Sequence, residues 1–297
     1  MISRRVFCVS MACTASSNAA FTPGDASAAE KQGTDLERKL ADIERTSGGR
    51  LGVAVIDTRT GARAAHRAEE RFPMCSTFKL LAAAAILQRV DAGQEKLDRR
   101  IAFGPSDLVV NSPTTKARVA EGSLTLAELC EAAMVVSDNT AGNLLLANLG
   151  GPAGLTAFAR SLGDRASRLD RWEPDLNEAV PEDPRDTTTP AAMLENIRQL
   201  VLGDVLSAAS RRQLTAWLVG NKTGDTRLRA SLPKEWHVGD KTGGGERGTT
   251  NDVGLLWPPD RDPVIVSAYL TGSPLSPEQR NAAIAAVGEA VAGSLRA

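Results

Sequence analysis

The sequence predicts an α/β fold in which both ends of the chain build one unit of sheet and helix, with an all-helical unit beside it. Strand-like alternation of apolar residues occurs near both ends, and the stretch from Phe72 to about Leu218 has helical spacing instead. Strands at both ends therefore have to meet in space. A cleft between two such units is a common ligand site. The expected boundaries are 29–70 and 219–297 for the α/β unit and 71–218 for the all-helical unit.

Composition limits the class of protein. The chain has 297 residues, 42% of them hydrophobic and 24% charged, which allows one large domain or two with an ample core. The formal net charge of −1 argues against nucleic acid or an anionic membrane surface as the main partner. Four cysteines occur without a Cys-x-x-Cys pair, and His66 and His237 are the two histidines. Neither histidine has a second ligand at metal spacing, so we expect no metal and no cofactor.

The first 28 residues are interpreted as a signal peptide. Residues 3–7, Ser-Arg-Arg-Val-Phe, resemble a twin-arginine export signal, and Ala26-Ser27-Ala28 fits signal-peptidase cleavage. The alternative is a disordered N-terminus with a chance arginine pair. Export would place the product in the periplasm or outside the cell, where we expect Cys75 and Cys130 to be buried and unpaired. No other apolar run approaches membrane length, so we expect no membrane association after export.

The first elements follow from local signals. A capping box at Thr34–Glu37 predicts the start of a helix, and Gly48-Gly49 predicts its end. Residues 50–58 have the alternation of a strand, and a turn at Thr60-Gly61 leads into a second short strand through His66.

The rest of the chain is organised around Met74–Leu87. Its apolar run predicts a buried helix that is too short to span a membrane. Ser76 and Lys79 lie three residues apart and therefore share one helix face. A serine at a helix N-terminus, beside a lysine that is costly to bury without partners, is a plausible activated nucleophile. The structural alternative is a capping serine and a lysine whose ammonium group reaches solvent.

Helices are expected through the middle of the chain and strands again at its end. The exception in the middle is Arg168–Pro190, whose four prolines and many acidic residues predict a long structured loop, a kind of loop that is often functional. A turn over 258–263 joins the last two strands, and Ser276-Pro277 opens a final helix. The expected helices are Leu124–Val136, Thr140–Leu149, Leu155–Ser161, Ala191–Val201 and Ser207–Leu218; the expected strands are Trp236–Thr242, Thr250–Trp257 and Val264–Leu270.

Two short motifs flank these elements. Ser137-Asp138-Asn139 separates two helices, and its structural alternative is a set of ordinary helix caps. Lys241-Thr242-Gly243-Gly244-Gly245 ends a strand, where the missing side chains would let a ligand lie against free N–H groups beside a positive charge. Its alternative is a glycine-rich hairpin turn.

A third constellation lies in the long loop. Arg171 and Asp186 are expected to form an ion pair that closes an Ω-loop. Glu173 within it could act as a general base, with Asn177 holding the same water molecule. The structural alternative for Glu173 is a solvated loop carboxylate.

Taken together, Ser-x-x-Lys, Ser-Asp-Asn, Glu-Pro-x-Leu-Asn and Lys-Thr-Gly in this order form a specific pattern. The sequence resembles a class A serine β-lactamase over residues 29 to 297. The resemblance implies an antiparallel sheet with flanking helices, an all-helical subdomain, and an active site in the cleft between them. It also implies a monomeric, secreted or periplasmic hydrolase that opens penicillins and cephalosporins, its small-molecule partners, through an acyl-enzyme and so confers resistance.

The resemblance also implies roles for individual residues. Ser76 would be the acylated nucleophile and Lys79 its partner, with either Lys79 or Glu173 as the acylation base. Glu173 would activate the deacylating water together with Asn177, and the Glu173–Pro174 bond would be cis. The remaining roles are a proton relay to the leaving nitrogen at Ser137, side-chain amide binding at Asn139, carboxylate binding at Lys241 and Thr242, and an oxyanion hole from the N–H groups of Ser76 and Gly244.

Four positions depart from the pattern. Thr250 stands where many class A enzymes carry a carboxylate-binding arginine, and Arg227 lies where a subset of the family supplies the replacement. Asn111 stands where an aromatic side chain usually walls the cleft. Gly245 replaces a cysteine that pairs with Cys75 in some carbapenem-hydrolysing members, so that disulfide is not expected. Cys130 similarly lacks its usual partner, because Ala84 occupies that position.

Three other functions remain open at this point. A penicillin-binding transpeptidase or carboxypeptidase would share the serine and lysine motifs but would not need residues 173–177. A β-lactam sensor would be acylated and stop there. A Ser-His-Asp hydrolase would need His66 or His237 beside its nucleophile.

Overall fold

The computed structural model describes residues 23–295, with side chains from Thr34 onward. The twin-arginine segment lies outside these residues, so the signal peptide stays a prediction. No helix within the described part of the chain is both long and apolar enough to cross a membrane.

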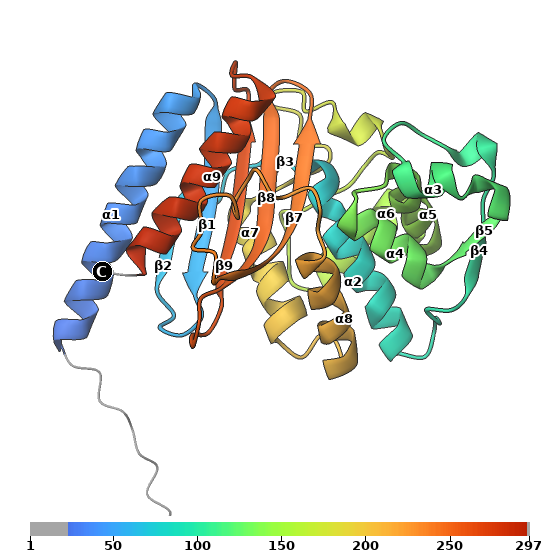
Figure 1. Ribbon diagram of the computed structural model, residues 1–297, viewed down its shortest axis with the longest axis horizontal. Coiled ribbons are helices and arrows are strands. Elements are labelled where there is room, and N and C mark those ends of the chain that lie inside the picture. The colour runs from blue at the N-terminus through green and yellow to red at the C-terminus, as the bar shows by residue number, and fades with distance from the viewer. Residues whose placement is uncertain (1–22, 296–297) are drawn as a thin grey trace, which may run out of the picture.

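A five-stranded antiparallel sheet joins the two ends of the chain, in the order β2-β1-β9-β8-β7 (Figure 1). The first two strands come from the N-terminal part and the other three from the C-terminal part, which confirms the predicted fold class. The strand bounds are β1 Arg50–Asp57, β2 Arg63–His66, β7 His237–Gly245, β8 Thr249–Trp257 and β9 Val264–Thr271.

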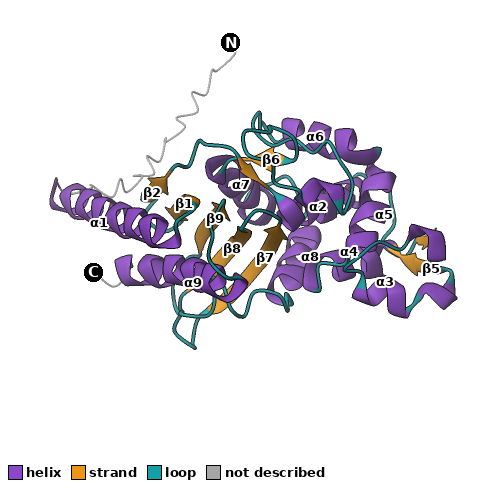
Figure 2. Ribbon diagram, turned by 90° about the horizontal axis from the view of Figure 1, so that it is seen from above, coloured by secondary structure: helices purple, strands orange, loops and turns teal. Residues whose placement is uncertain are grey.

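Helices cover both faces of the sheet. Helices α1 (Pro23–Ser47) and α9 (Pro277–Ser294) lie side by side on one face, and α7 (Pro190–Ile197) lies on the other (Figure 2). The side chains of β1 point alternately to the two faces of the sheet, which explains this arrangement. Val53 and Val55 belong to the core under α1 and α9. Ala54 and Ile56 belong to the core on the opposite face.

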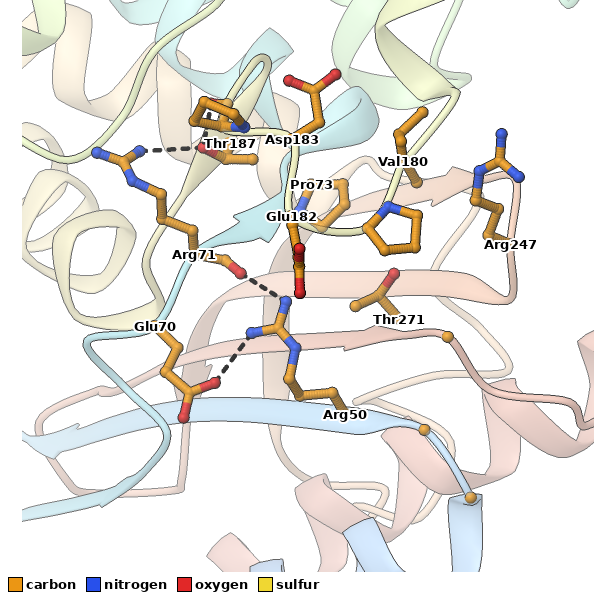
Figure 3. A pocket seen from close by; sticks show the side chains of 16 residues that line it. Arg50, Glu70, Arg71, Pro73, Val180, Glu182, Asp183, Thr187, Arg247 and Thr271 are labelled. Carbon is orange, nitrogen blue, oxygen red and sulfur yellow. Dashed lines mark hydrogen bonds and ion pairs between the residues drawn. The ribbon is translucent and has the colours of Figure 1, made fainter.

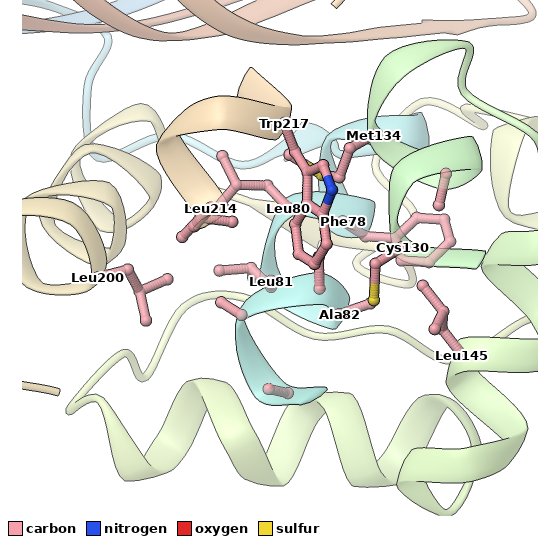
Figure 4. Packing of buried hydrophobic residues seen from close by; sticks show 14 of the residues in the cluster. Phe78, Leu80, Leu81, Ala82, Cys130, Met134, Leu145, Leu200, Leu214 and Trp217 are labelled. Carbon is pink, nitrogen blue, oxygen red and sulfur yellow. The ribbon is translucent and has the colours of Figure 1, made fainter. Parts of the chain in front are cut away.

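Helix α2 (Phe78–Asp91) is the central helix of the helical part, and Phe78–Leu87 is buried throughout. Side chains from the surrounding helices enclose it, among them Met134, Leu145 and Trp217 (Figure 4). The predicted buried helix is therefore confirmed. The helices around it are α4 Leu126–Val135, α5 Asn139–Leu149, α6 Gly151–Ser161 and α8 Ala208–Val219.

Several short elements complete the fold. Two small sheets pair β3 (Phe72–Pro73) with β6 (Thr187–Thr188) and β4 (Arg100–Ala102) with β5 (Ser123–Thr125). The short helical turns are α3 Pro113–Ala117, the 3₁₀ turns η1 Cys75–Thr77, η2 Pro105–Asp107, η3 Val119–Glu121 and η4 Asp175–Asn177, and the π-turn η5 Arg198–Leu202.

Some element boundaries differ from the prediction. Helix α1 begins at Pro23 rather than at the Thr34 capping box and runs across the predicted cleavage position, because residues 23–33 are rich in helix formers and begin with a proline. Strand β7 continues past Thr242, since its glycines still pair with β8 as far as Gly245. Helix α4 starts two residues later than expected because the preceding residues form β5.

Gly52 in β1 allows Phe72 and Pro190 to pack against the sheet. A Cβ atom there would lie 2.3 Å from the Phe72 ring and 2.8 Å from Pro190. We expect Gly52→Ala to destabilise the protein by roughly 1–3 kcal/mol in urea unfolding, the usual cost of overpacking a core. Gly104→Ala is the control, because no atom lies within 4 Å of its Cβ position. Equal stabilities for the two variants would contradict this packing.

Candidate active site

Four segments that are far apart in sequence converge at Ser76. They are the turn η1 with the first turn of α2, the junction of α4 and α5, the loop 168–190 and strand β7. Ser76 itself lies in η1, just before α2 rather than within it, and the left-handed Cys75 (φ 45°) makes the turn into it. The structure brings Lys79, Ser137 and Glu173 into direct contact with one another or with Ser76.

Lys79 is the hub of these contacts. Its Nζ lies 2.9 Å from Ser76 Oγ and 2.9 Å from the carbonyl oxygen of Ser137. It also donates to Asn139 Oδ1 at 2.6 Å and lies 3.0 Å from Glu173 Oε1. Burial lowers the pKa of Lys79 because it disfavours the charged ammonium, and the Glu173 carboxylate opposes this shift. Lys79 can therefore exchange a proton with the serine hydroxyl beside it.

Glu173 faces the same hydroxyl from the loop. Ser76 Oγ donates to Glu173 Oε1 at 3.3 Å, so one water molecule could contact both groups. Asn177 Nδ2 donates to the other carboxylate oxygen, Oε2, and to the carbonyl of Pro174. The side chain of Glu173 is fully buried, unlike the solvated carboxylate of the structural alternative.

The expected ion pair closes the Ω-loop. Arg171 Nε lies 2.6 Å from Asp186 Oδ2, and Asp186 also accepts the backbone N–H groups of Asp170 and Arg171. Arg171 reaches Glu178 as well, at 2.7 Å. The Glu173–Pro174 peptide bond is cis, as the family resemblance implied.

Sequence reasoning missed two residues of α5 that position these groups. Asn143 binds the backbone of Glu173 twice, since its Oδ1 accepts the Glu173 N–H at 2.9 Å and its Nδ2 donates to the Glu173 carbonyl at 3.0 Å. Gly142 leaves room for Lys79, because a Cβ atom there would lie 2.8 Å from Lys79 Cε. The helical spacing of Asn143 from Asn139 was a signal that could have identified it.

Lys241 and Ser137 form the opposite wall. Lys241 Nζ donates to Ser137 Oγ and to the carbonyl of Thr242, both at 3.0 Å. Burial and the positive charges of Lys79 and Arg227 hold the pKa of Lys241 well below its usual value.

The cleft beyond Lys241 is a cavity of about 400 Å³ whose lining includes Asn139, Asn177, Arg227 and Gly244. Arg227 donates through Nη1 to the carbonyls of Gly243 and Asn251, both at 2.7 Å, and through Nε to Asn281. Its Nη2 lies 3.8 Å from the Cβ position of Gly244. This guanidinium is therefore fixed beside the glycine-rich strand edge.

The chain matches known proteins over almost its whole length. A family model for the β-lactamase enzyme family matches residues 35–295. β-Lactamase CTX-M-8 of Citrobacter amalonaticus is 50% identical over 260 residues, 88% of this chain and 89% of the relative. β-Lactamase AST-1 of Nocardia asteroides is 52% identical over 257 residues, 86% of this chain and 83% of the relative. The structure of an ancestral class A β-lactamase has a TM-score of 0.86 at 62% identity, covering 87% of this chain and 99% of that one.

The chain belongs to the class A β-lactamase family. The predicted family and enzyme class, a hydrolase of β-lactams, are thereby confirmed. The Ser-His-Asp alternative loses its basis, because His66 pairs with Glu44 of α1 at 2.9 Å and His237 is exposed at the start of β7.

The cysteines of this class A β-lactamase are free and buried in the described part of the chain, as expected for Cys75 and Cys130. A Cβ atom at Gly245 would lie 2.7 Å from Cys75 Sγ. A cysteine at position 245, the partner that some family members have, would therefore lie next to Cys75. Burial raises the pKa of the Cys75 thiol, which disfavours the reactive thiolate even though Cys75 lies beside Ser76. Thr250, at the position of the usual arginine, is buried on β8 and accepts a hydrogen bond from Arg280.

A second cavity, of about 680 Å³, lies behind the Ω-loop and contains none of the predicted site residues (Figure 3). Two of its arginines already have partners: Arg50 binds Glu70 and the carbonyl of Arg71, and Arg71 binds Thr187. Among the residues with described side chains, no group of three His, Cys, Asp or Glu side chains could hold a metal ion.

Asn143 provides a test of how the Ω-loop is held. Replacing it by alanine removes two hydrogen bonds and leaves the buried N–H and carbonyl of Glu173 without those partners, so we expect Asn143→Ala to cost roughly 1–3 kcal/mol of stability. Faster limited proteolysis within residues 168–190 should accompany the loss. Asn148→Ala is the control, since this asparagine of the same helix contacts Arg89 and Arg99 instead. Unchanged proteolysis in Asn143→Ala would contradict the assignment.

Proposed function

We propose that this chain hydrolyses the β-lactam amide bond of penicillins and cephalosporins through an acyl-enzyme on Ser76, and so confers resistance to these antibiotics. The observation that carries the proposal is the buried contact of three groups: Ser76 Oγ lies 2.9 Å from Lys79 Nζ and 3.3 Å from Glu173 Oε1. A hydroxyl between an amine and a carboxylate has two candidate bases within reach.

In acylation, Ser76 Oγ attacks the lactam carbonyl as its proton passes to Lys79 or to Glu173. The lowered pKa of Lys79 makes it easier for this group to pass a proton to and from its neighbours during the reaction. The C–N bond then breaks, and Ser137, which lies between the two lysines, gives its proton to the leaving nitrogen while it takes one from the Lys79 ammonium. The N–H groups of Ser76 and Gly244 stabilise the negative oxygen of the tetrahedral intermediate.

Deacylation is the step that distinguishes a hydrolase from a protein that stays acylated. Glu173, held through Asn177, takes a proton from a water molecule as that water attacks the Ser76 ester. The ester C–O bond breaks, the proton returns to Ser76 Oγ, and the opened product leaves. A transpeptidase or a sensor would not need a fully buried glutamate in contact with the nucleophile.

Substrate recognition is assigned to the walls of the cleft. Asn139 binds the side-chain amide of the substrate, and Lys241 and Thr242 bind its carboxylate. Arg227 adds a second positive charge in place of the arginine that position 250 lacks, which its fixed guanidinium beside Gly244 supports.

The remaining expectations form part of the same proposal. The chain is exported by the signal in residues 1–28, acts as a monomer in the periplasm or outside the cell, and binds neither nucleic acid nor membrane. The two predicted units, 29–70 with 219–297 and 71–218, meet at the cleft described above.

Glu173→Ala tests the deacylation step. We expect acylation to continue while the covalent intermediate accumulates, because the variant has no carboxylate to activate water; intact-mass spectrometry with benzylpenicillin would detect the adduct. Glu182→Ala, at an exposed carboxylate of the same loop, is the control and should turn over normally. Steady turnover in Glu173→Ala at the parent rate would remove Glu173 from the mechanism.

Arg227→Ala tests carboxylate recognition. A hydrogen bond to a charged group contributes about 1.5–3 kcal/mol, so we expect KM for benzylpenicillin to rise roughly 10-fold or more while kcat changes less. Arg212→Ala, at an exposed arginine of α8, should leave both constants unchanged. If the two variants have the same KM, Arg227 has no part in binding substrate.

A further inference from the structure

The hydroxyl of Thr242, assigned above to the substrate carboxylate, has a neighbour outside the family motifs. Thr223 lies between α8 and β7, and its Oγ1 is in hydrogen-bond contact with Thr242 Oγ1. On its other side, Thr223 Oγ1 donates to Asn221 Oδ1 at 2.7 Å. The two hydroxyls and the amide thus form a chain that leads from the cleft into the protein.

Buried charges fix the inner end of this chain. Asn221 Nδ2 donates to Asp240 Oδ1, and Arg229 donates to both oxygens of the same carboxylate. Asp240 is fully buried and Asn221 is 3% exposed. Because the carboxylate accepts hydrogen bonds, the amino group of Asn221 has to face Asp240 and its carbonyl oxygen has to face Thr223.

The positions of the protons follow from this orientation. The carbonyl oxygen of Asn221 can only accept a hydrogen bond, so the Thr223 hydroxyl donates its single proton to it. Toward Thr242, the Thr223 oxygen can therefore act only as an acceptor. In the free protein, the hydroxyl proton of Thr242 therefore points toward Thr223 and away from the cleft. A substrate carboxylate also only accepts, so it can bind Thr242 once this proton has turned toward the cleft.

We propose that Thr223 is a positioning residue for the substrate carboxylate. When Thr242 turns its proton to the carboxylate, Thr223 turns its own proton from Asn221 to Thr242, and Asn221 Oδ1 keeps the backbone N–H of Thr223. The direction of both hydroxyls reverses, and no buried hydroxyl loses its partner. Thr242 is 4% exposed. When substrate is bound, the Thr242 hydroxyl therefore has the Thr223 hydroxyl as its other hydrogen-bond partner.

Kinetics give the first test, which rests on the proposed function because it uses benzylpenicillin turnover. By the bonds described above, losing the Thr223 hydroxyl removes two hydrogen bonds from the free protein and one from the complex. We therefore expect Thr223→Val to lower KM roughly 2- to 10-fold, the equivalent of one net hydrogen bond, with kcat within about 2-fold of the parent. Thr223→Ser should restore the parent KM. Thr215→Val, which alters a threonine bonded within α8, is the control. A parent-like or raised KM in Thr223→Val, or a KM in Thr223→Ser that differs from the parent, would overturn the proposal; absence of turnover in the parent would instead overturn the proposed function.

Neutron diffraction gives a second test that does not depend on turnover. In deuterated crystals of the free protein, we expect the Thr242 deuteron on the line to Thr223 Oγ1. In the Glu173→Ala protein acylated by benzylpenicillin, it should lie on the line to the substrate carboxylate, with the Thr223 deuteron directed at Thr242. A Thr242 deuteron that already points into the cleft in the free protein, or that stays on Thr223 in the complex, would overturn the proposal. The buried hydroxyl pair of Ser112 and Thr140 is an internal control that should not change.

Discussion

The buried ammonium group of Lys79 is the interaction on which the rest of the structure depends. A lysine at the head of an apolar helix is costly to bury unless oxygen atoms surround it, and here they come from Ser76, Ser137, Asn139 and Glu173. These partners lie on three separate stretches of the chain. The requirement to compensate one charge therefore draws together Ser76, the α4–α5 junction and the Ω-loop, which are also the segments that the proposed chemistry needs.

The Ω-loop holds its glutamate by contacts that are independent of that charge. The Arg171–Asp186 ion pair closes the base of the loop, and Asn143 fixes the backbone of Glu173 from α5. Strand β7 supplies the facing wall, where Lys241 reaches Ser137. Rigid elements on both sides thus hold the proposed reacting groups in place before substrate arrives, and this preorganisation is what an oxyanion-stabilising site requires.

The sequence was most informative where chemistry restricts residue choice. Ser76, Lys79, Glu173 and Lys241 were identified because four such motifs seldom occur in this order by chance, and the apolar run of α2 has the length and spacing of a buried helix. Residues such as Asn143 and Thr223 were missed because their partners are distant in sequence and become neighbours only in the fold. The start of α1 was misplaced because a local capping signal was outweighed by helix formers before it.

The positive side of the cleft depends on Arg227 in the proposed mechanism. Two backbone carbonyls and Asn281 fix this guanidinium in place, and we propose that it replaces the arginine absent from position 250. The central claim remains the transient ester on Ser76. Rapid quenching of the parent enzyme during benzylpenicillin turnover, followed by peptide mass mapping, tests it most directly. The account predicts an adduct on the peptide that carries Ser76, which disappears when the substrate is exhausted; an adduct on another residue, or one that persists, would contradict it.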